Sequence, residues 1–157
     1  MSLEQVKTFF RTLEIEQRII EFNTTTATVS LAAEALGVPP ARICKTLSFQ
    51  NDEGCILIQT AGDKKISNSK FKSTFGRKAR MLSPEQVLEY TGHPVGGVCA
   101  FAIKDPRVTI CCDQSLKEYE TLFPACGSSN SAVEMTPEEI YQYSHSSRWV
   151  DVCRDKE

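Results

Sequence analysis

The sequence predicts an α+β domain in which a mixed, curled β-sheet is flanked by helices. Expected strands outnumber expected helices, hairpin-like strand pairs alternate with single helices, and no series of parallel βαβ units occurs. With 157 residues, of which 41% are hydrophobic and 24% charged, residues 1–157 have the size and composition of one soluble globular domain. The sequence contains no signal-peptide pattern and no apolar run of membrane-spanning length, which predicts a cytoplasmic protein without a membrane partner.

The N-terminal half contains two helix patterns followed by a strand hairpin. Ser2 and Gln5 form a capping box before apolar residues at helical spacing, which predicts a first helix. Thr28 is a suitable N-cap and Gly37 a suitable stop for a second helix, and two prolines follow. Strands are expected at 18–22, 42–50 and 54–62, the last two joined by the turn "NDEG".

The C-terminal half alternates short helices with further strands. Ser83 as N-cap, proline at the next position and Gln86 predict a helix that ends at Gly92. The Thr-Pro pair at 136–137 begins another helix in the same way, and a short helix is expected within 67–76. Strands are expected at 78–82, 107–113, 120–127, 131–135 and 148–152.

Cysteine and histidine give little support for metal or nucleophilic chemistry. The seven cysteines show no C-x-x-C pair and no zinc-ligand spacing, so we expect small buried thiols in a reducing compartment and no metal site. His145 lies in a polar tail, and His93 stands between Gly92 and a proline, where a turn is expected. A Cys99–His93 nucleophile pair and a Ser-His-Asp site remain open alternatives at this stage.

Lys45 is a polar residue at an apolar position of an expected strand. Alternation along "RICKTLSFQ" places Lys45 on the same face as Ile43 and Leu47. Buried lysines are rare unless they are paired or used, and an ammonium that faces a cleft can anchor a phosphate or carboxylate. The alternative is a lysine whose apolar stem packs on the sheet while its charge reaches solvent.

The segment "TGHPVGGVCAFAI" (91–103) interrupts an apolar stretch with three glycines. Glycine inside a strand-like segment marks a bulge, a bend or a close approach to the backbone. Gly96 and Gly97 could present backbone N–H groups to a developing oxyanion, each worth about 10²- to 10³-fold in rate. A lysine and such a loop, without a conventional base, suit a reaction in which the substrate supplies its own reactive groups.

The net charge of −2 hides an uneven distribution of charge. Residues 64–80 contain seven of the 18 basic residues and no acidic residue. Such a stretch can bind phosphates on one face of an acidic protein, or it can simply be a solvated surface.

Five motifs, in order along nearly the whole chain, resemble the YbaK/EbsC family, the free-standing relatives of the editing domain in bacterial prolyl-tRNA synthetases. They are "TVSLAAEALGVPPARICKTLSF", "AGDKKIS", "KARMLSPEQVLEYTGHPVGGVCAF", "CCDQSL" and "ACGSSNSAVEMTPEEI". The third motif contains the family's Thr-Gly-x-x-x-Gly-Gly loop. The resemblance implies a single domain, residues 1–157, with a barrel-like sheet.

The resemblance implies hydrolysis of mischarged aminoacyl-tRNA in trans, with alanine or cysteine removed from prolyl tRNA. Deacylation would depend on Lys45, the Gly96-Gly97 loop would line the aminoacyl site, and the ribose hydroxyl of the tRNA would assist water attack. Neither a cofactor nor a metal is implied; the partners would be the acceptor end of the tRNA and prolyl-tRNA synthetase. Further substrate contacts are expected from Ile19, Phe22, Thr46, Gly92, His93, Val98, Cys99 and Ala100. Phosphate contacts are expected from Lys64, Lys65, Lys70, Lys72 and Arg77.

Ala100 departs from the family pattern. The family loop usually reads Gly-Gly-x-x-Pro, and in "GGVCAF" Ala100 stands where the proline is expected. Proline there would stiffen the loop through its fixed φ. Its absence leaves open a second hypothesis, a non-catalytic tRNA- or synthetase-binding module that has kept the fold.

Overall fold

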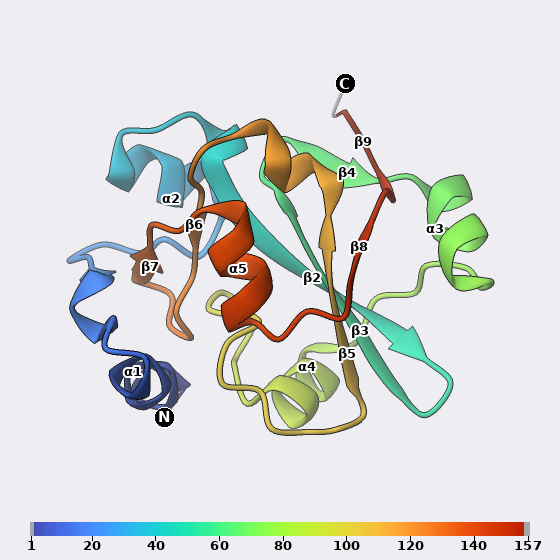
Figure 1. Cartoon of the computed structure of the whole chain (residues 1–157), viewed down its shortest axis with the longest axis horizontal. Coiled ribbons are helices and arrows are strands. Elements are labelled where there is room, and N and C mark those ends of the chain that lie inside the picture. Colours follow the sequence, from blue (N-terminus) through green and yellow to red (C-terminus); the bar gives the residue numbers. More distant parts are fainter. Residues whose placement is uncertain (1, 156–157) are drawn as a thin grey trace.

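A five-stranded mixed sheet with the order β6-β2-β3-β5-β8 forms the centre of the computed structural model, which describes residues 2–155 (Figure 1). Two-stranded sheets pair β1 with β7 and β4 with β9. The strands are β1 Ile19–Glu21, β2 Ile43–Asn51, β3 Gly54–Ala61, β4 Lys64–Ile66, β5 Val108–Asp113, β6 Phe123–Pro124, β7 Ser131–Val133, β8 Arg148–Val150 and β9 Cys153–Asp155. The α-helices of the described residues are α1 Ser2–Thr12, α2 Val29–Leu36, α3 Asn68–Phe75, α4 Pro84–Thr91 and α5 Pro137–Tyr143. The predicted α+β class with a mixed sheet is confirmed.

The hairpin of β2 and β3 forms the interior of the five-stranded sheet, and β3 is buried along its whole length. β2 and β3 are antiparallel with Lys45 opposite Thr60, whereas β6 joins β2 and β5 joins β3 in parallel. Burial on both faces explains why "GCILIQTA" is nearly continuously apolar rather than alternating.

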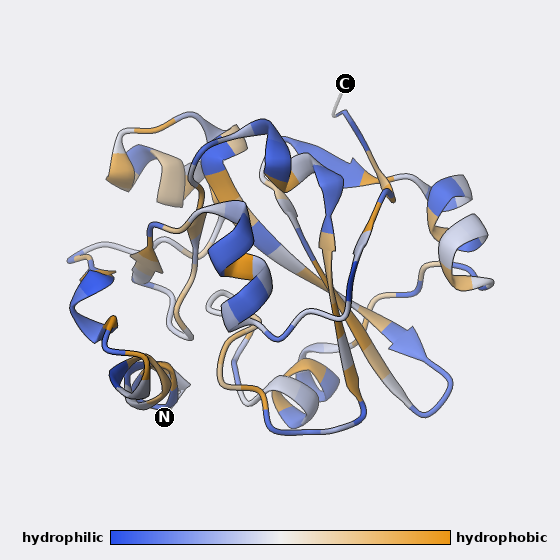
Figure 2. Cartoon of the chain, viewed as in Figure 1, coloured by the Kyte–Doolittle hydropathy of each residue, from blue (hydrophilic) through white to orange (hydrophobic). Residues whose placement is uncertain are grey.

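Helices cover the two faces of the sheet with separate apolar clusters. One cluster packs Ile56 and Ile58 of β3 against Phe71 of α3. The neighbouring residues of β3, Cys55 and Leu57, point the other way and pack with Val87 of α4. Figure 2 shows hydrophobic colour along the crossing strands and hydrophilic colour at the turn between β2 and β3.

The helix ends follow the predicted capping signals. The Thr28 hydroxyl accepts from the backbone N–H of Leu31, and Gly37 ends α2 with a φ of 69°. Capping boxes are present at Ser83 and Gln86 in α4 and at Thr136 and Glu139 in α5.

Several predicted elements are shorter or different in the structure. The strand expected at 78–82 is wrong except for an isolated bridge from Met81 to Phe49, because the stretch only touches the edge of β2. The strand expected at 120–127 is reduced to β6, where Pro124 lacks a donor, and to an isolated antiparallel bridge between Leu122 and Met135. Ser2 is not an N-cap: it lies inside α1 and its hydroxyl donates to the Gly127 carbonyl. Strand β9 was not predicted.

Arg18 fastens the region before β1 to the start of α5. Its guanidinium donates to both carboxylate oxygens of Glu139, at 2.8 and 3.0 Å, and to the Glu134 carbonyl. The hydrogen bonds from Arg18 lower the pKa of Glu139. A carboxylate with a lowered folded pKa stabilises the fold above its unfolded pKa, about 4.3, and that contribution is lost as pH falls through the folded pKa.

We therefore expect Arg18→Met to cost about 1 kcal/mol of unfolding free energy at pH 7, with the deficit narrowing below about pH 4. Urea unfolding of both proteins across that range checks this. Arg11→Met is the matched control, because its pair with Glu16 is more exposed and its loss should cost less at every pH. A deficit for Arg18→Met that grows on acidification would contradict this assignment.

Within residues 2–155, no helix combines the length and the apolar character that crossing a membrane requires.

Candidate functional site

A cavity of about 360 Å³ opens at one edge of the central sheet. Its wall combines the edge of β2, the start of α2, the region of β6 and β7, the start of α4 and the glycine segment. Elements far apart in the sequence therefore meet there. Of the residues expected from the sequence, the cavity is lined by Lys45, Thr46, Gly96 and Val98.

The cavity occupies a gap in the pairing of β2. On the edge of β2 away from β3, β6 covers Ile43 and Cys44. Further along, the Gln50 N–H donates to the Arg80 carbonyl and the Leu82 N–H to the Ser48 carbonyl. Backbone groups of an antiparallel strand alternate between its two edges, so the N–H and C=O of Thr46 point to the same edge as those of Ser48 and Gln50. The cavity thus has a strand edge as one of its walls.

Lys45 is a half-buried residue of this wall, and its side chain also bonds to strand β4. Its ammonium donates to the backbone carbonyl of Lys64 in β4. Among the described residues that line the cavity, Lys45 is the one that carries a charge. The residues that line the cavity therefore include one cation and no carboxylate, which favours an anionic or ester-bearing ligand.

The two glycines of the loop have different surroundings. Gly96 lines the cavity with a φ of 101°, a conformation that side chains rarely adopt. Gly97 instead packs on the backbone of Ser128, where a Cβ would lie 2.7 Å from backbone atoms. Its N–H donates to the Pro94 carbonyl at 3.0 Å, so this amide closes a turn. The sequence-based expectation of two free amide donors is thus reduced to one, that of Gly96.

The other residues expected to contact the substrate do not line the β2-edge cavity. Phe22 packs on the cluster of Ala32 and Phe123, which do line the cavity, whereas Ile19 packs on the core beside α1. Gly92 caps the end of α4 with a φ of 76°. Ala100 is buried, and the hollow that it lines is a different one, next to α1.

His93 and Cys99 do not form a nucleophile pair. Both are fully buried, and His93 Nε2 lies 2.8 Å from the Phe101 carbonyl, to which it must donate. Burial lowers the pKa of His93 and raises that of Cys99 to about 12, so the imidazole stays neutral and the thiol stays protonated. The Cys99 sulfur is 3.5 Å from the same Nε2, which is already used.

Much of the wall carries no chemical signal in the sequence. Small and apolar residues form it, among them Ala27, Ala32, Ala125 and Ala132, together with Thr26 and Ser131. Alanine and serine in these positions matter only through the space that they leave. Burial also raises the pKa of Cys44 well above its usual value, so this wall thiol is a neutral group. Among residues 2–155, no group of three or more His, Cys, Asp or Glu side chains is placed to hold a metal ion.

The basic stretch 64–80 is divided between paired and unpaired charges. Lys64 pairs with Asp155 and Glu118, Lys70 with Asp151, and Arg77 with Asp52. Neither Lys65 nor Lys72 makes an ion pair within the part of the chain that the structure describes.

Comparison with known proteins identifies the family to which this fold belongs. The model of the aminoacyl-tRNA editing domain family matches residues 24–143, which include the cavity wall. The chain belongs to this family. The resemblance to its YbaK/EbsC members is thereby confirmed.

Relatives of this editing domain occur both as free-standing proteins and within synthetases. The uncharacterized protein YwhH of Bacillus subtilis is 53% identical over the full length of both chains. A proline–tRNA ligase of Thermotoga sp. is 30% identical over 59% of this chain, which spans 16% of the ligase. The crystal structure of a proposed trans-editing enzyme for prolyl tRNA synthetase superposes with a TM-score of 0.86 and 25% identity, over 99% of this chain and 98% of the other.

Proposed function

We propose that this editing domain is a trans-acting deacylase that hydrolyses mischarged aminoacyl-tRNA, with alanine or cysteine on prolyl tRNA as the substrate. The observation that carries the proposal is the cavity at the β2 edge, where Lys45 and Gly96 meet in a chain of this family. A synthetase cannot strongly reject a smaller or near-isosteric amino acid, because one methylene is worth only about 1–3 kcal/mol. A second, hydrolytic site removes the resulting error.

The proposed reaction is hydrolysis of the ester between the amino acid and the terminal ribose. Water adds to the ester carbonyl carbon, the C–O bond to the ribose breaks, and free amino acid and uncharged tRNA leave. The charge of Lys45 and the Gly96 amide would stabilise the oxyanion, and the neighbouring ribose hydroxyl would assist the water. This division of roles fits a wall without histidine or carboxylate.

The small-residue wall supports a small, uncharged amino-acid side chain as the group removed. The alanines and Ser131 surround a space of limited volume, and no wall carboxylate is present to receive a basic side chain. Thr46 and Gly96 would contact the aminoacyl group through backbone atoms, and Val98 through its apolar side chain.

A deacylation panel tests the proposal directly. Purified protein is incubated with tRNA for proline charged with alanine, cysteine, serine or proline, and release of labelled amino acid is followed against buffer. We expect release of alanine or cysteine well above the buffer rate and retention of proline. Binding of the charged tRNA without release of any of the four would instead establish the non-catalytic tRNA-binding module.

Lys72 is expected to contribute to tRNA affinity without affecting chemistry. It is exposed on α3 and makes no ion pair among the described residues, so Lys72→Ala should raise KM severalfold at low salt and leave kcat unchanged. The slope of log KM against log salt should fall by about one unit for the lost phosphate contact.

Lys70→Ala is the matched control on the same helix, because the Lys70 ammonium already bonds Asp151 and the Cys153 carbonyl. It should change KM and the salt slope less than Lys72→Ala does. Equal effects of the two variants would argue against a specific phosphate contact at Lys72.

A further inference from the structure

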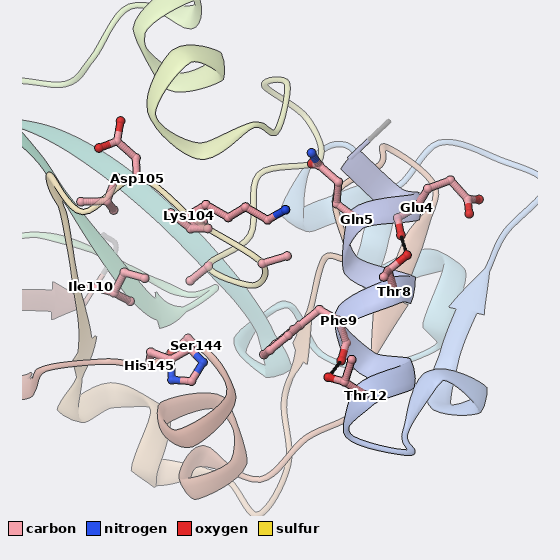
Figure 3. A pocket seen from close by; sticks show the side chains of 14 residues that line it. Glu4, Gln5, Thr8, Phe9, Thr12, Lys104, Asp105, Ile110, Ser144 and His145 are labelled. Atoms are coloured by element: carbon pink, nitrogen blue, oxygen red, sulfur yellow. Dashed lines mark hydrogen bonds between the residues drawn. The ribbon is translucent and has the colours of Figure 1, made fainter.

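A second hollow, of about 610 Å³, lies between α1, residues 100–105 and the end of α5 (Figure 3). Its volume is within the range of about 300–1,000 Å³ that small-molecule sites occupy. The residues that line it are separate from those of the β2-edge cavity. The proposed editing reaction leaves this hollow without a role.

The floor of the hollow is apolar and contains an aromatic pair. Phe9 projects from α1, and Ile110 lies on the facing side. Ile103 also lines the hollow. The rings of Phe9 and His145 have centroids 5.9 Å apart and are inclined by 53°. Such a floor provides a stacking surface for a flat apolar group.

Backbone strain is concentrated on two walls of this hollow. Among the described non-glycine residues, a positive φ occurs at Glu14, Ala102 and His145. Ala102, with φ 59°, lies in the loop, and His145, with φ 56°, follows α5, so two of the three line the hollow. A residue with a side chain is strained in such a conformation, and strain of this kind gathers at ligand sites.

The charged residues that line the hollow are Lys104 and two carboxylates, Glu4 and Asp105. Asp105 accepts from Arg107 Nε at 3.1 Å and Nη2 at 2.8 Å, and these bonds lower the pKa of Asp105. Glu4 lies 3.8 Å from the Lys7 ammonium, which is closer to Glu21, at 3.0 Å. Lys104 makes no ion pair within residues 2–155, and Figure 3 shows it reaching from the loop toward α1.

We propose that this hollow is a second ligand site, which takes a small organic carboxylate with a flat apolar body. The body lies on Phe9 and the loop residues, and the carboxylate pairs with the Lys104 ammonium. The inference does not depend on the proposed editing function, because it uses different residues.

The test uses indole-3-propionate and its uncharged amide, indole-3-propionamide, as matched probes. Each is titrated into ¹⁵N-labelled protein while backbone chemical shifts are recorded. We expect saturable shifts around Phe9, Ala102 and Ile103, with the carboxylate binding about fivefold more tightly than the amide, as an ion pair worth about 1 kcal/mol requires. Shifts centred on Thr46 and Gly96, equal affinities for the two probes, or no saturable shift would overturn the proposal.

Three variants assign the binding to this hollow. Lys104→Glu should weaken indole-3-propionate about fivefold or more and leave the amide unaffected. Thr8→Trp, at an exposed α1 position on the wall, should fill the space and weaken both probes. Lys78→Glu, the same charge change at an exposed lysine outside the hollow, should leave both affinities unchanged. If Lys104→Glu and Lys78→Glu bind indole-3-propionate equally, the assignment is wrong.

Discussion

Lys45→Ala is expected to lower kcat/KM for deacylation of mischarged prolyl tRNA by about 10²- to 10³-fold, the range found when one oxyanion-stabilising donor is removed. Among the residues that line the cavity, Lys45 supplies the charge, and no wall carboxylate or histidine could replace it. Single-turnover deacylation with alanyl- or cysteinyl-tRNA measures the loss. Lys45→Arg should recover part of the rate, because it keeps the charge but changes the geometry of the donors.

Loss of fold must be separated from loss of chemistry in this variant. The Lys45 ammonium also bonds the Lys64 carbonyl, so Lys45→Ala should lose about 1 kcal/mol of stability and remain folded at assay temperature. Lys65→Ala, one residue beyond Lys64 on β4, is the control and should keep the chemical rate of the unaltered protein. A Lys45→Ala rate within threefold of the unaltered protein would remove this residue from the proposed mechanism.

Gly97→Ala is expected to cost about 2–3 kcal/mol of unfolding free energy, which lowers Tm by about 5–10 °C in a domain of this size. A Cβ at this position would lie 2.7 Å from three backbone atoms of Ser128. Backbone cannot turn aside as a side chain does, so the loop or the segment around Ser128 must shift. Because Val95, Gly96 and Val98 line the cavity, the same shift should also lower kcat/KM.

Gly76→Ala is the matched control for this stability effect. Gly76 caps α3 with a φ of 72°, and no heavy atom lies within 4 Å of an added Cβ. It should cost only about 1 kcal/mol, from the left-handed conformation alone, and should not change the deacylation rate. Thermal unfolding of both variants distinguishes a packing clash from conformational strain, and equal Tm losses would count against the clash at Gly97.

Local chemistry in the sequence predicts much of this fold. Thr28 with Gly37, and Ser83 with Gly92, set the ends of two helices, because side-chain caps and left-handed glycines act within a few residues. The hairpin of β2 and β3 follows from its apolar strands and polar turn. Strand β9 could not be found in this way, since its pairing with β4 depends on residues almost 90 positions away.

The candidate site was only partly predictable, for the same reason. Lys45 is conspicuous because a charge interrupts an apolar face, and Gly96 because glycine interrupts an apolar segment. The different role of Gly97 depends on Ser128, and the burial of His93 depends on its bond with Phe101; neither contact has a local signal. The alanine-rich wall could not be predicted from the sequence either, because small residues contribute to the cavity only through the volume that they leave empty.

The measurement that tests the proposed site most directly is a structure with a non-hydrolysable substrate end, 3′-alanylamino-3′-deoxyadenosine, whose amide replaces the labile ester. We expect the alanyl group in the β2-edge cavity, in contact with Thr46 and Gly96 and close to Lys45. Binding of the analogue in the hollow beside α1, or a β2-edge cavity left empty at saturating analogue, would contradict the proposed site.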